Sequence, residues 1–199
     1  MSVLVVNCNQ WIGFHVVNEL LDNQHEVDGV IDRNISDDLS MFFGRNSSFS
    51  FVSGKERKIY STCIIIGHNK EIDVPHAERI FVINSDEETI HSLNENTVHI
   101  QALLFGEWMP MNQNGFYHDG KLLSFDSKEF KEDAIYIHDF TSALVQWVNS
   151  SKLPNEKEMK VNRNDIENGI YMNDKNFITK KKDNVLTHYE RYKNFYPQN

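Results

Sequence analysis

The first 33 residues, MSVLVVNCNQWIGFHVVNELLDNQHEVDGVIDR, constrain the fold of this chain more than any other segment. An apolar run over Val3–Val6 leads through a short polar loop into a segment whose apolar residues recur at helical spacing from Ile12. A second apolar run then ends at Asp32. This order predicts a β-strand, an α-helix and a second, parallel strand, which is the unit from which α/β folds are built.

The loop between the first strand and the helix departs from a known glycine pattern. Asp32 stands 19 residues after Gly13, near the spacing of the acid that bonds ribose hydroxyls in dinucleotide-binding units. The three glycine positions of that fingerprint read Asn7, Gln10 and Gly13, so only the glycine that serves helix packing is present. Gln10 places a side chain where phosphates would lie, and Trp11 adds bulk beside it. The N–H groups at the helix start still favour an anion. The sequence therefore predicts a nucleotide-binding plan whose phosphate cradle is altered.

The rest of the chain alternates short apolar runs with amphipathic stretches, which predicts a Rossmann-like α/β fold with a mainly parallel sheet and helices on both faces. Further strands are expected at Ser48–Val52, Cys63–Ile66, Arg79–Ile83, Val98–Phe105 and Ala134–His138. Further helices are expected after a capping box at Ser85, over residues 140–148 and over Val185–Phe195, with a hairpin turn at Asp119-Gly120. Because the composition turns polar from Asn149, we expect a nucleotide-binding-type domain over residues 1–150 and a small C-terminal remnant over 151–199.

Composition narrows the class of protein. The net charge of −9 disfavours non-specific binding to nucleic acid or to an anionic membrane, since both attract basic surfaces. Cys8 and Cys63 each lie in or beside an apolar run, which predicts reduced thiols in a cytosolic core. We see neither a signal peptide nor a membrane-spanning segment, so a cytoplasmic location is expected.

Four segments occur in an order that resembles a known family. They are VVNCNQWIGFHVVNELLDNQHEV, RIFVINSDE, VHIQALLFGEWMP and AIYIHDFTSALVQWV, all within residues 1–150. This order is similar to that of extended short-chain dehydrogenases/reductases of the NAD-dependent epimerase/dehydratase group, which act largely on nucleotide sugars. The resemblance implies an NAD(P)-binding fold, and with the altered loop it gives these candidate cofactor-binding residues: Asn7, Asn9, Gln10, Trp11, Ile12, Asp32, Arg33 and His68.

Two of these assignments have alternatives that the sequence leaves open. Asp32 would favour NAD through the ribose hydroxyls and Arg33 would favour NADP, or the two residues simply close a strand with polar groups. His68 and Asn69 follow a strand end where a bound ligand would lie, or they belong to a solvated loop.

The resemblance fails at the family's catalytic pair. Its Tyr-x-x-x-Lys should stand on a long helix between the fifth and sixth strands, but the 12 residues Asp86–Thr97 contain neither tyrosine nor lysine. The same spacing recurs at Tyr117/Lys121, Tyr171/Lys175 and Tyr189/Lys193, as chance allows in a chain with seven tyrosines. No tight spacing of histidine or cysteine predicts a metal site either. We therefore assign no catalytic and no metal-binding residue.

These observations predict a degenerate, compact relative of the epimerases and dehydratases. It would be non-catalytic or weakly active and would bind a nucleotide-type ligand or a protein partner, with NAD or NADP still allowed. The usual family dimer is not expected, because the helix through which it forms is missing. The alternatives are an active nucleotide-sugar epimerase, dehydratase or reductase with relocated catalytic residues, and a scaffold for such an enzyme.

Overall fold

The computed structural model describes residues 2–36, 38–53, 58–67, 76–85, 96–150, 158–161 and 177–197. Contacts group the chain into two compact units. Unit 1 comprises Met1–Gln101 and Leu144–Lys160, and unit 2 comprises Ala102–Ala143 and Val161–Asn199. The predicted domain division at residue 150 stays a prediction.

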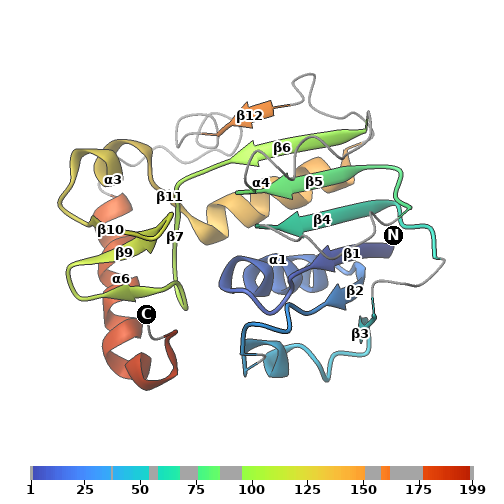
Figure 1. Ribbon diagram of the computed structural model, residues 1–199, viewed down its shortest axis with the longest axis horizontal. Helices are drawn as coiled ribbons and strands as arrows, with labels where there is room; N and C mark the ends of the chain where they lie inside the picture. The colour runs from blue at the N-terminus through green and yellow to red at the C-terminus, as the bar shows by residue number, and fades with distance from the viewer. Residues whose placement is uncertain are drawn as a thin grey trace. The chain divides into compact units, whose positions relative to one another are not determined.

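Unit 1 is built on a seven-stranded parallel sheet (Figure 1). Its strands are β1 (Ser2–Val6), β2 (Glu26–Val30), β3 (Phe49–Phe51), β4 (Thr62–Ile66), β5 (Ile80–Ile83), β6 (Thr97–Gln101) and β12 (Glu158–Lys160). They lie in the order β12-β6-β5-β4-β1-β2-β3, and every neighbouring pair is parallel. The reversal of strand order beside β1 is that of a doubly wound Rossmann fold, so the predicted fold class is confirmed.

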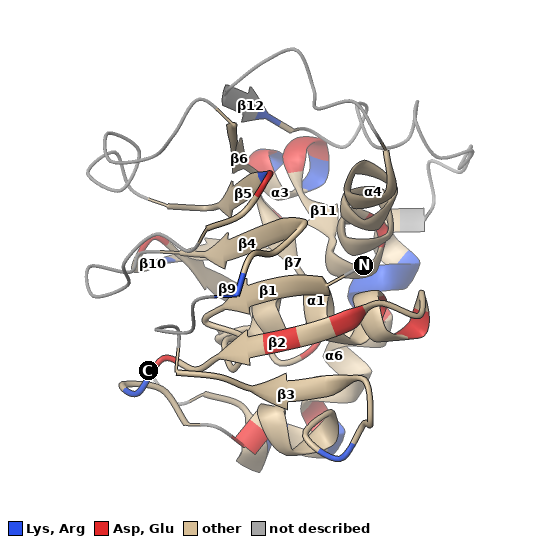
Figure 2. Cartoon of the chain, turned by 90° about the vertical axis from the view of Figure 1, so that its right-hand side faces the viewer, with Lys and Arg blue, Asp and Glu red and all other residues tan. Residues whose placement is uncertain are grey.

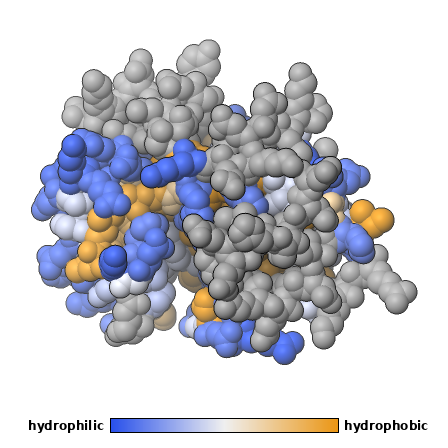
Figure 3. Space-filling model, turned by 45° about the horizontal axis from the view of Figure 1, so that its top comes forward, coloured by the Kyte–Doolittle hydropathy of each residue, from blue (hydrophilic) through white to orange (hydrophobic). Residues whose placement is uncertain are grey.

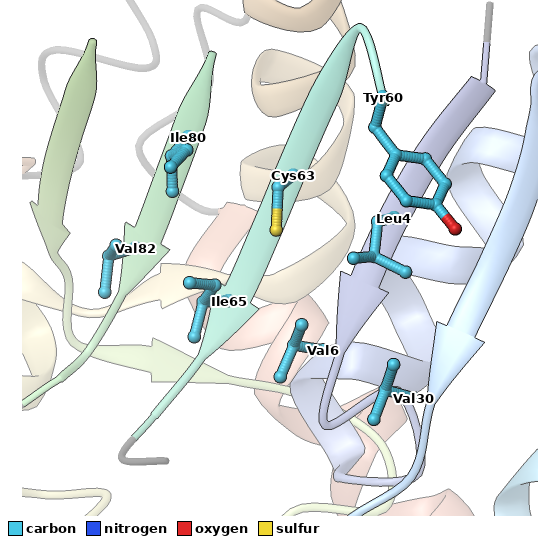
Figure 4. Packing of buried hydrophobic residues seen from close by; sticks show 8 residues of the cluster. All are labelled: Leu4, Val6, Val30, Tyr60, Cys63, Ile65, Ile80 and Val82. Atoms are coloured by element: carbon cyan, nitrogen blue, oxygen red, sulfur yellow. The ribbon is translucent and has the colours of Figure 1, made fainter. Parts of the chain in front are cut away.

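Both faces of this sheet are packed, which explains why its strands are almost continuously apolar. On one face, alternate residues of neighbouring strands form a single cluster with Tyr60, which lies just before β4 (Figure 4). Its members are Leu4, Val6, Val30, Tyr60, Cys63, Ile65, Ile80 and Val82. The intervening residues, such as Val5 and Ile64, are fully buried on the opposite face. A parallel strand covered on both sides cannot alternate apolar with polar residues, and β4, with the sequence TCIII, follows this rule.

The helix α1 (Trp11–Asp22) joins β1 to β2 and buries Ile12, Val16 and Leu20. The second half of α4 (Ile137–Asn149) also belongs to unit 1. Seen from the face of the apolar cluster, α1 and the second half of α4 run behind the strands (Figure 4). Arg79, just before β5, donates to the carbonyl oxygens of Val148 (2.8 Å) and Ser150 (2.6 Å). A cation thus satisfies the last carbonyls of α4 and ties its end to the sheet.

Unit 2 contains two small sheets and several helices. A two-stranded parallel sheet pairs β7 (Leu104–Phe105) with β11 (Ile135–Tyr136), and a three-stranded antiparallel sheet contains β8 (Met111–Asn112), β9 (Gly115–His118) and β10 (Lys121–Ser124). The helical elements are α3 (Lys128–Asp133), the first half of α4, α6 (Phe177–Tyr192) and the 3-10 helix η2 (Lys193–Phe195). Buried rings of Phe105, Phe116, Phe125 and Phe130 form its core, with centroids 5.0–6.0 Å apart.

One predicted strand is wrong as a single element. The run Val98–Phe105 is divided between β6, which ends at Gln101, and β7, which belongs to another sheet. The Leu103 carbonyl accepts a hydrogen bond from the N–H of Ile135 (2.8 Å), so the chain has left β5 and pairs with β11. The run is apolar because its residues are buried in two different cores, and the spacing of its apolar residues does not show where the first core ends.

The predicted strand over Ala134–His138 is shorter than expected, because α4 already begins at Ile137. His138 and Asp139 therefore lie in the first turn of α4 and not before it. The hairpin turn is confirmed: Asp119 and Gly120 both have positive φ (48° and 71°) between β9 and β10. The helix expected after Ser85 lies outside the described residues.

Among the described residues no helix combines the length and the hydropathy that crossing a membrane requires. The face shown in Figure 3 mixes hydrophilic and apolar residues over the part that is described.

Gly13 is the glycine on which the β1–α1 connection depends. A Cβ atom there would lie 2.4 Å from the Asn7 carbonyl oxygen and 2.9 Å from the Cys8 Cα. The backbone atoms of Asn7 and Cys8 cannot move away without disturbing the turn. We therefore expect Gly13→Ala to lower the free energy of unfolding by about 3 kcal/mol, measured by urea unfolding. Gly120→Ala is the matched control: its Cβ meets nothing within 4 Å, and only the positive φ opposes it, at about 1 kcal/mol. Equal losses in the two variants would contradict this account.

Candidate functional site

The candidate site lies at the carboxyl edge of the parallel sheet in unit 1. β1, β4 and β5 are each followed by a residue with positive φ: Asn7 (61°), Gly67 (65°) and Asn84 (49°). The N–H of Gly67 donates to the Ile83 carbonyl (2.8 Å), and the N–H of Asn84 donates to the Ile100 carbonyl (2.9 Å). The strands therefore turn away along one shared line, the line at which open α/β sheets bind ligands.

Asn7 closes the turn after β1. Its backbone is left-handed, its carbonyl accepts from the N–H of Gln10 (3.1 Å), and its side chain is fully buried. The Nδ2 atom donates to the carbonyl oxygen of Ile66 (2.7 Å) at the end of β4. Asparagine thus replaces glycine by combining tolerance of the left-handed region with a bond that glycine lacks. The Asn7 amide points into the fold and joins two strands.

Asn9 holds the end of β2. Its Nδ2 donates to the Asp32 carbonyl (2.9 Å), while its Oδ1 accepts from the Asp32 N–H (2.7 Å). The Asp32 carboxylate accepts from the backbone N–H (2.9 Å) and Nδ2 (3.1 Å) of Asn34, which forms a local turn. Asp32 therefore keeps its place at the β2 end in a fixed conformation, and Arg33 beside it is exposed.

Gln10 lies at the point where the phosphate cradle would be. It is the N-cap residue of α1, but its side chain makes no capping hydrogen bond. Instead its amide reaches toward Gly67: a Cβ at residue 67 would lie 3.4 Å from Gln10 Oε1 and 3.8 Å from Nε2. Trp11 packs edge-on to His15 one turn along α1 (6.3 Å between ring centroids), and Ile12 is buried. The predicted residue His68 lies outside the described residues.

The cysteines of unit 1 offer no reactive thiolate. Cys8 and Cys63 are both free and fully buried, and burial raises the pKa of each thiol to about 12. Both thiols are therefore protonated at neutral pH. Within the described ranges, no group of histidine, cysteine and carboxylate side chains is arranged to hold a metal ion.

A second polar cluster, in unit 2, was not predicted from the sequence. Glu107 Oε1 accepts from the Tyr136 hydroxyl (2.7 Å), and Glu107 Oε2 lies 3.6 Å from His138 Nε2. Lys181, which is 7% exposed, bonds the Asp139 carboxylate and stands 4.9 Å from the centroid of the Tyr136 ring. These residues come from β11, the first turn of α4, α6 and the loop after β7.

The charges of this cluster oppose basic catalysis by its tyrosine. Burial alone would raise the pKa of Glu107, but the neighbouring His138 and hydrogen bonds from Tyr136 and the backbone outweigh it and lower the pKa to about 2. Burial and the Glu107 carboxylate together raise the pKa of Tyr136. Tyr136 is therefore a hydrogen-bond donor to a carboxylate, whereas a catalytic tyrosine of the family needs a lowered pKa.

Of the tyrosine–lysine pairs noted in the sequence, Tyr117 and Lys121 are not brought together by the structure. In the β9–β10 hairpin Tyr117 stands opposite Leu122, and Lys121 stands opposite His118. Residues opposite one another share a face and consecutive residues alternate, so Tyr117 and Lys121 point to different faces. Tyr189 packs edge-on to the ring of Tyr196, and the pair Tyr171/Lys175 lies outside the described residues.

Trp108 anchors the C-terminal helix within unit 2. Its φ of 66° is unusual for a bulky residue. Its ring lies 4.6 Å from that of His188 and 5.2 Å from that of Tyr196, and His188 Nδ1 is 2.7 Å from the Tyr196 hydroxyl. The conformation of Trp108 is thus held by rings from α6 and from the residue after η2, which is a structural role.

Comparisons with known proteins agree with this geometry at the level of the fold. No protein-family model and no curated protein sequence matches the chain. Among solved structures, dTDP-glucose 4,6-dehydratase from Bacillus anthracis in complex with NAD is similar, with 9% identity over 98% of each chain and a TM-score of 0.62.

Two further structures are similar. Pal from Bacillus thuringiensis has 13% identity over 81% of this chain and 78% of its own, with a TM-score of 0.54. The Bordetella bronchiseptica enzyme WbmG in complex with NAD has 9% identity over 96% of this chain and 94% of its own, with a TM-score of 0.53. The chain therefore has the Rossmann-like fold of NAD-complexed enzymes, and its resemblance to the epimerase/dehydratase group is confirmed as a likeness of fold.

The role of Asn7 can be separated into two parts by a pair of variants. Asn7→Gly removes the buried hydrogen bond to Ile66 but accepts the positive φ, and we expect a loss of about 1–2 kcal/mol in the free energy of unfolding. Asn7→Ala removes the same bond and adds the left-handed cost of about 1 kcal/mol, so it should be the less stable variant in urea unfolding. An alanine variant as stable as the glycine variant would contradict the assignment.

Glu107 predicts a specific loss of stability in acid. Its folded pKa of about 2 lies below the ordinary value of 4.5, so its contribution is complete above pH 4.5 and is lost as the pH falls toward 2. This contribution is on the order of 3 kcal/mol. Urea unfolding across this range should show a shallower acid dependence for Glu107→Gln than for the unmodified chain. The exposed carboxylate variant Glu132→Gln should keep the original dependence, and an identical slope in all three proteins would refute the prediction.

Proposed function

We propose that this chain is a non-catalytic or weakly active Rossmann-like protein, derived from nucleotide-sugar epimerases and dehydratases, that binds a nucleotide-type ligand at the carboxyl edge of its parallel sheet. The observation that carries the proposal is the position of the Gln10 amide, which reaches from the start of α1 to Gly67 at the end of β4.

The ribose side of the edge fits a nucleotide. Asp32 stands at the end of β2 with its backbone fixed by Asn9. The first bond of α1 joins the N–H of Phe14 to the carbonyl of Gln10, which leaves three N–H groups at the helix start without an intrahelical acceptor. Since the Gln10 side chain does not cap them, they are available to an anion such as one phosphate group.

The dinucleotide side does not fit. In the family pattern the second glycine lets the backbone approach the pyrophosphate, and here that position is Gln10. An amide directed toward Gly67 lies across the path by which a dinucleotide would continue from its pyrophosphate to the end of β4. We therefore favour a ligand with one nucleoside and its phosphate over NAD or NADP.

The catalytic residue pair of the family is also absent from its expected position in the sequence. The segment that should carry Tyr-x-x-x-Lys contains neither residue type. The Tyr136 hydroxyl donates a hydrogen bond to the Glu107 carboxylate, and Tyr117 and Lys121 point to different faces of their hairpin. These placements support binding without hydride or proton transfer and weigh against the alternative of relocated catalytic residues.

Gln10→Gly tests the proposal, because it removes the obstructing amide and restores the glycine of the fingerprint. We expect this variant to bind NAD at least about tenfold more tightly than the unmodified chain in isothermal titration calorimetry, a gain of about 1.4 kcal/mol. Gln24→Gly is the matched control: Gln24 is exposed, has a φ of 63° and lies in the turn at the opposite end of α1. It should leave NAD affinity unchanged.

Mononucleotides test the retained part of the site. AMP and UDP should bind the unmodified chain more tightly than NAD does, and Asp32→Asn should weaken them. Tight saturable binding of NAD to the unmodified chain, together with reduction of a nucleotide sugar, would overturn the proposal.

A further inference from the structure

Unit 1 also has a group of exposed apolar side chains in and near β3. This group is separate from the proposed ligand site at the carboxyl edge of the sheet. Met41, Phe42 and Phe51 are 71%, 68% and 51% exposed. Met41 and Phe51 line a cavity of about 430 Å³ together with Ser40, Gly44 and Arg45. We refer to Ser40, Met41, Phe42, Gly44, Arg45 and Phe51 as the β3 patch. Clustered large apolar side chains that stay exposed typically mark a contact surface.

The β3 patch rests on a packed aromatic base. Phe43 and Phe49 are buried, and their ring centroids lie 4.6 Å apart. The exposed ring of Phe51 packs edge-on to Phe49 at 4.9 Å, and the exposed ring of Phe42 packs edge-on to Phe14 at 5.9 Å. Because the exposed rings are held by buried ones, the surface is ordered before any partner binds, which lowers the entropic cost of binding.

β3 also forms an edge of the seven-stranded sheet (Figure 2). Ser48 accepts from the N–H of Val27 (2.8 Å), and the N–H of Val52 donates to the Gly29 carbonyl (3.0 Å). Since alternate residues of a strand bond to the same neighbour, the backbone N–H and C=O of Phe51 point away from β2. β3 has the sequence FSF and so contains neither a charged residue nor a proline, the residue types that often prevent an edge strand from pairing.

We propose that the β3 patch is the interface at which two copies of this chain associate, with their β3 strands antiparallel across a two-fold axis at Phe51. In that arrangement each Phe51 donates its N–H to the other and accepts the other's N–H, as a hydrogen-bonded antiparallel pair does. The two patches then cover one another, because a two-fold axis brings the same surface of both copies together.

Charge favours a second copy as the occupant. The chain as a whole carries −9, so most of its surface would repel another copy. Residues 38–53 contain one acid, Asp38, and one base, Arg45, both exposed, and have no net charge. The same segment of two copies can therefore approach without like-charge repulsion. A two-fold axis also allows Asp38 of each copy to face Arg45 of the other.

The oligomeric state of the full chain tests the proposal. In analytical ultracentrifugation from about 1 to about 100 µM we expect a monomer–dimer equilibrium. Met41→Glu and Phe51→Glu should shift it to monomer, whereas Leu122→Glu, at an exposed position of β10 in unit 2, should not. Circular dichroism checks that each variant is folded. A chain that is monomeric throughout, or a dimer that both patch variants leave intact, overturns the proposal and leaves the patch to a segment of another protein.

Cross-linking tests the geometry independently. Cys8 and Cys63 are buried, so Phe51→Cys would introduce an exposed thiol. Opposed residues of a hydrogen-bonded antiparallel pair have Cα atoms about 5.5 Å apart, which suits a disulfide. Mild oxidation of Phe51→Cys should give a covalent dimer that reductant dissolves, and Leu122→Cys should give little. Equal cross-linking of the two variants would contradict the proposed axis.

Discussion

The close approach of α1 to the end of β1 is the constraint on which the rest of unit 1 depends. At Gly13 there is no room for a Cβ atom beside the Asn7 carbonyl, and Asn7 itself must take a left-handed conformation for the chain to turn. The Asn7 side chain then bonds the end of β4, so one turn fixes helix, first strand and neighbouring strand together. The start of α1, and with it the direction of Gln10, follows from this turn.

This constraint explains which glycines of the fingerprint are absent. The third glycine is required by packing between backbone atoms and is therefore needed whether or not a ligand binds. The first serves the turn, and Asn7 replaces it with a residue that tolerates positive φ and adds a buried bond. The second serves the approach to phosphate, and here Gln10 stands at that position as the N-cap residue of α1.

Much of the sheet could be predicted from the sequence, because strands buried on both faces are continuously apolar, as in TCIII of β4. Asp119-Gly120 was recognisable because its turn needs positive φ. The end of β6 was not, since Val98–Phe105 stays apolar while it passes from one core to another.

The polar cluster of unit 2 could not be predicted either. Glu107 and Tyr136 are 29 residues apart, and Lys181 lies 42 residues beyond Asp139. No local pattern relates such residues, so only the tertiary fold brings them together. The direction of the Gln10 side chain is likewise a tertiary result, because it depends on the space beside Gly67. The sequence showed that an amide stands at the phosphate position but not which way it points.

The most direct test of the central claim is a crystal structure of the unmodified chain grown with NAD at saturating concentration. We expect the Gln10 amide to stay against Gly67, with no ordered pyrophosphate between the start of α1 and the end of β4. A dinucleotide in well-defined density along that path, with Gln10 displaced and a tyrosine and a lysine beside its nicotinamide, would contradict it.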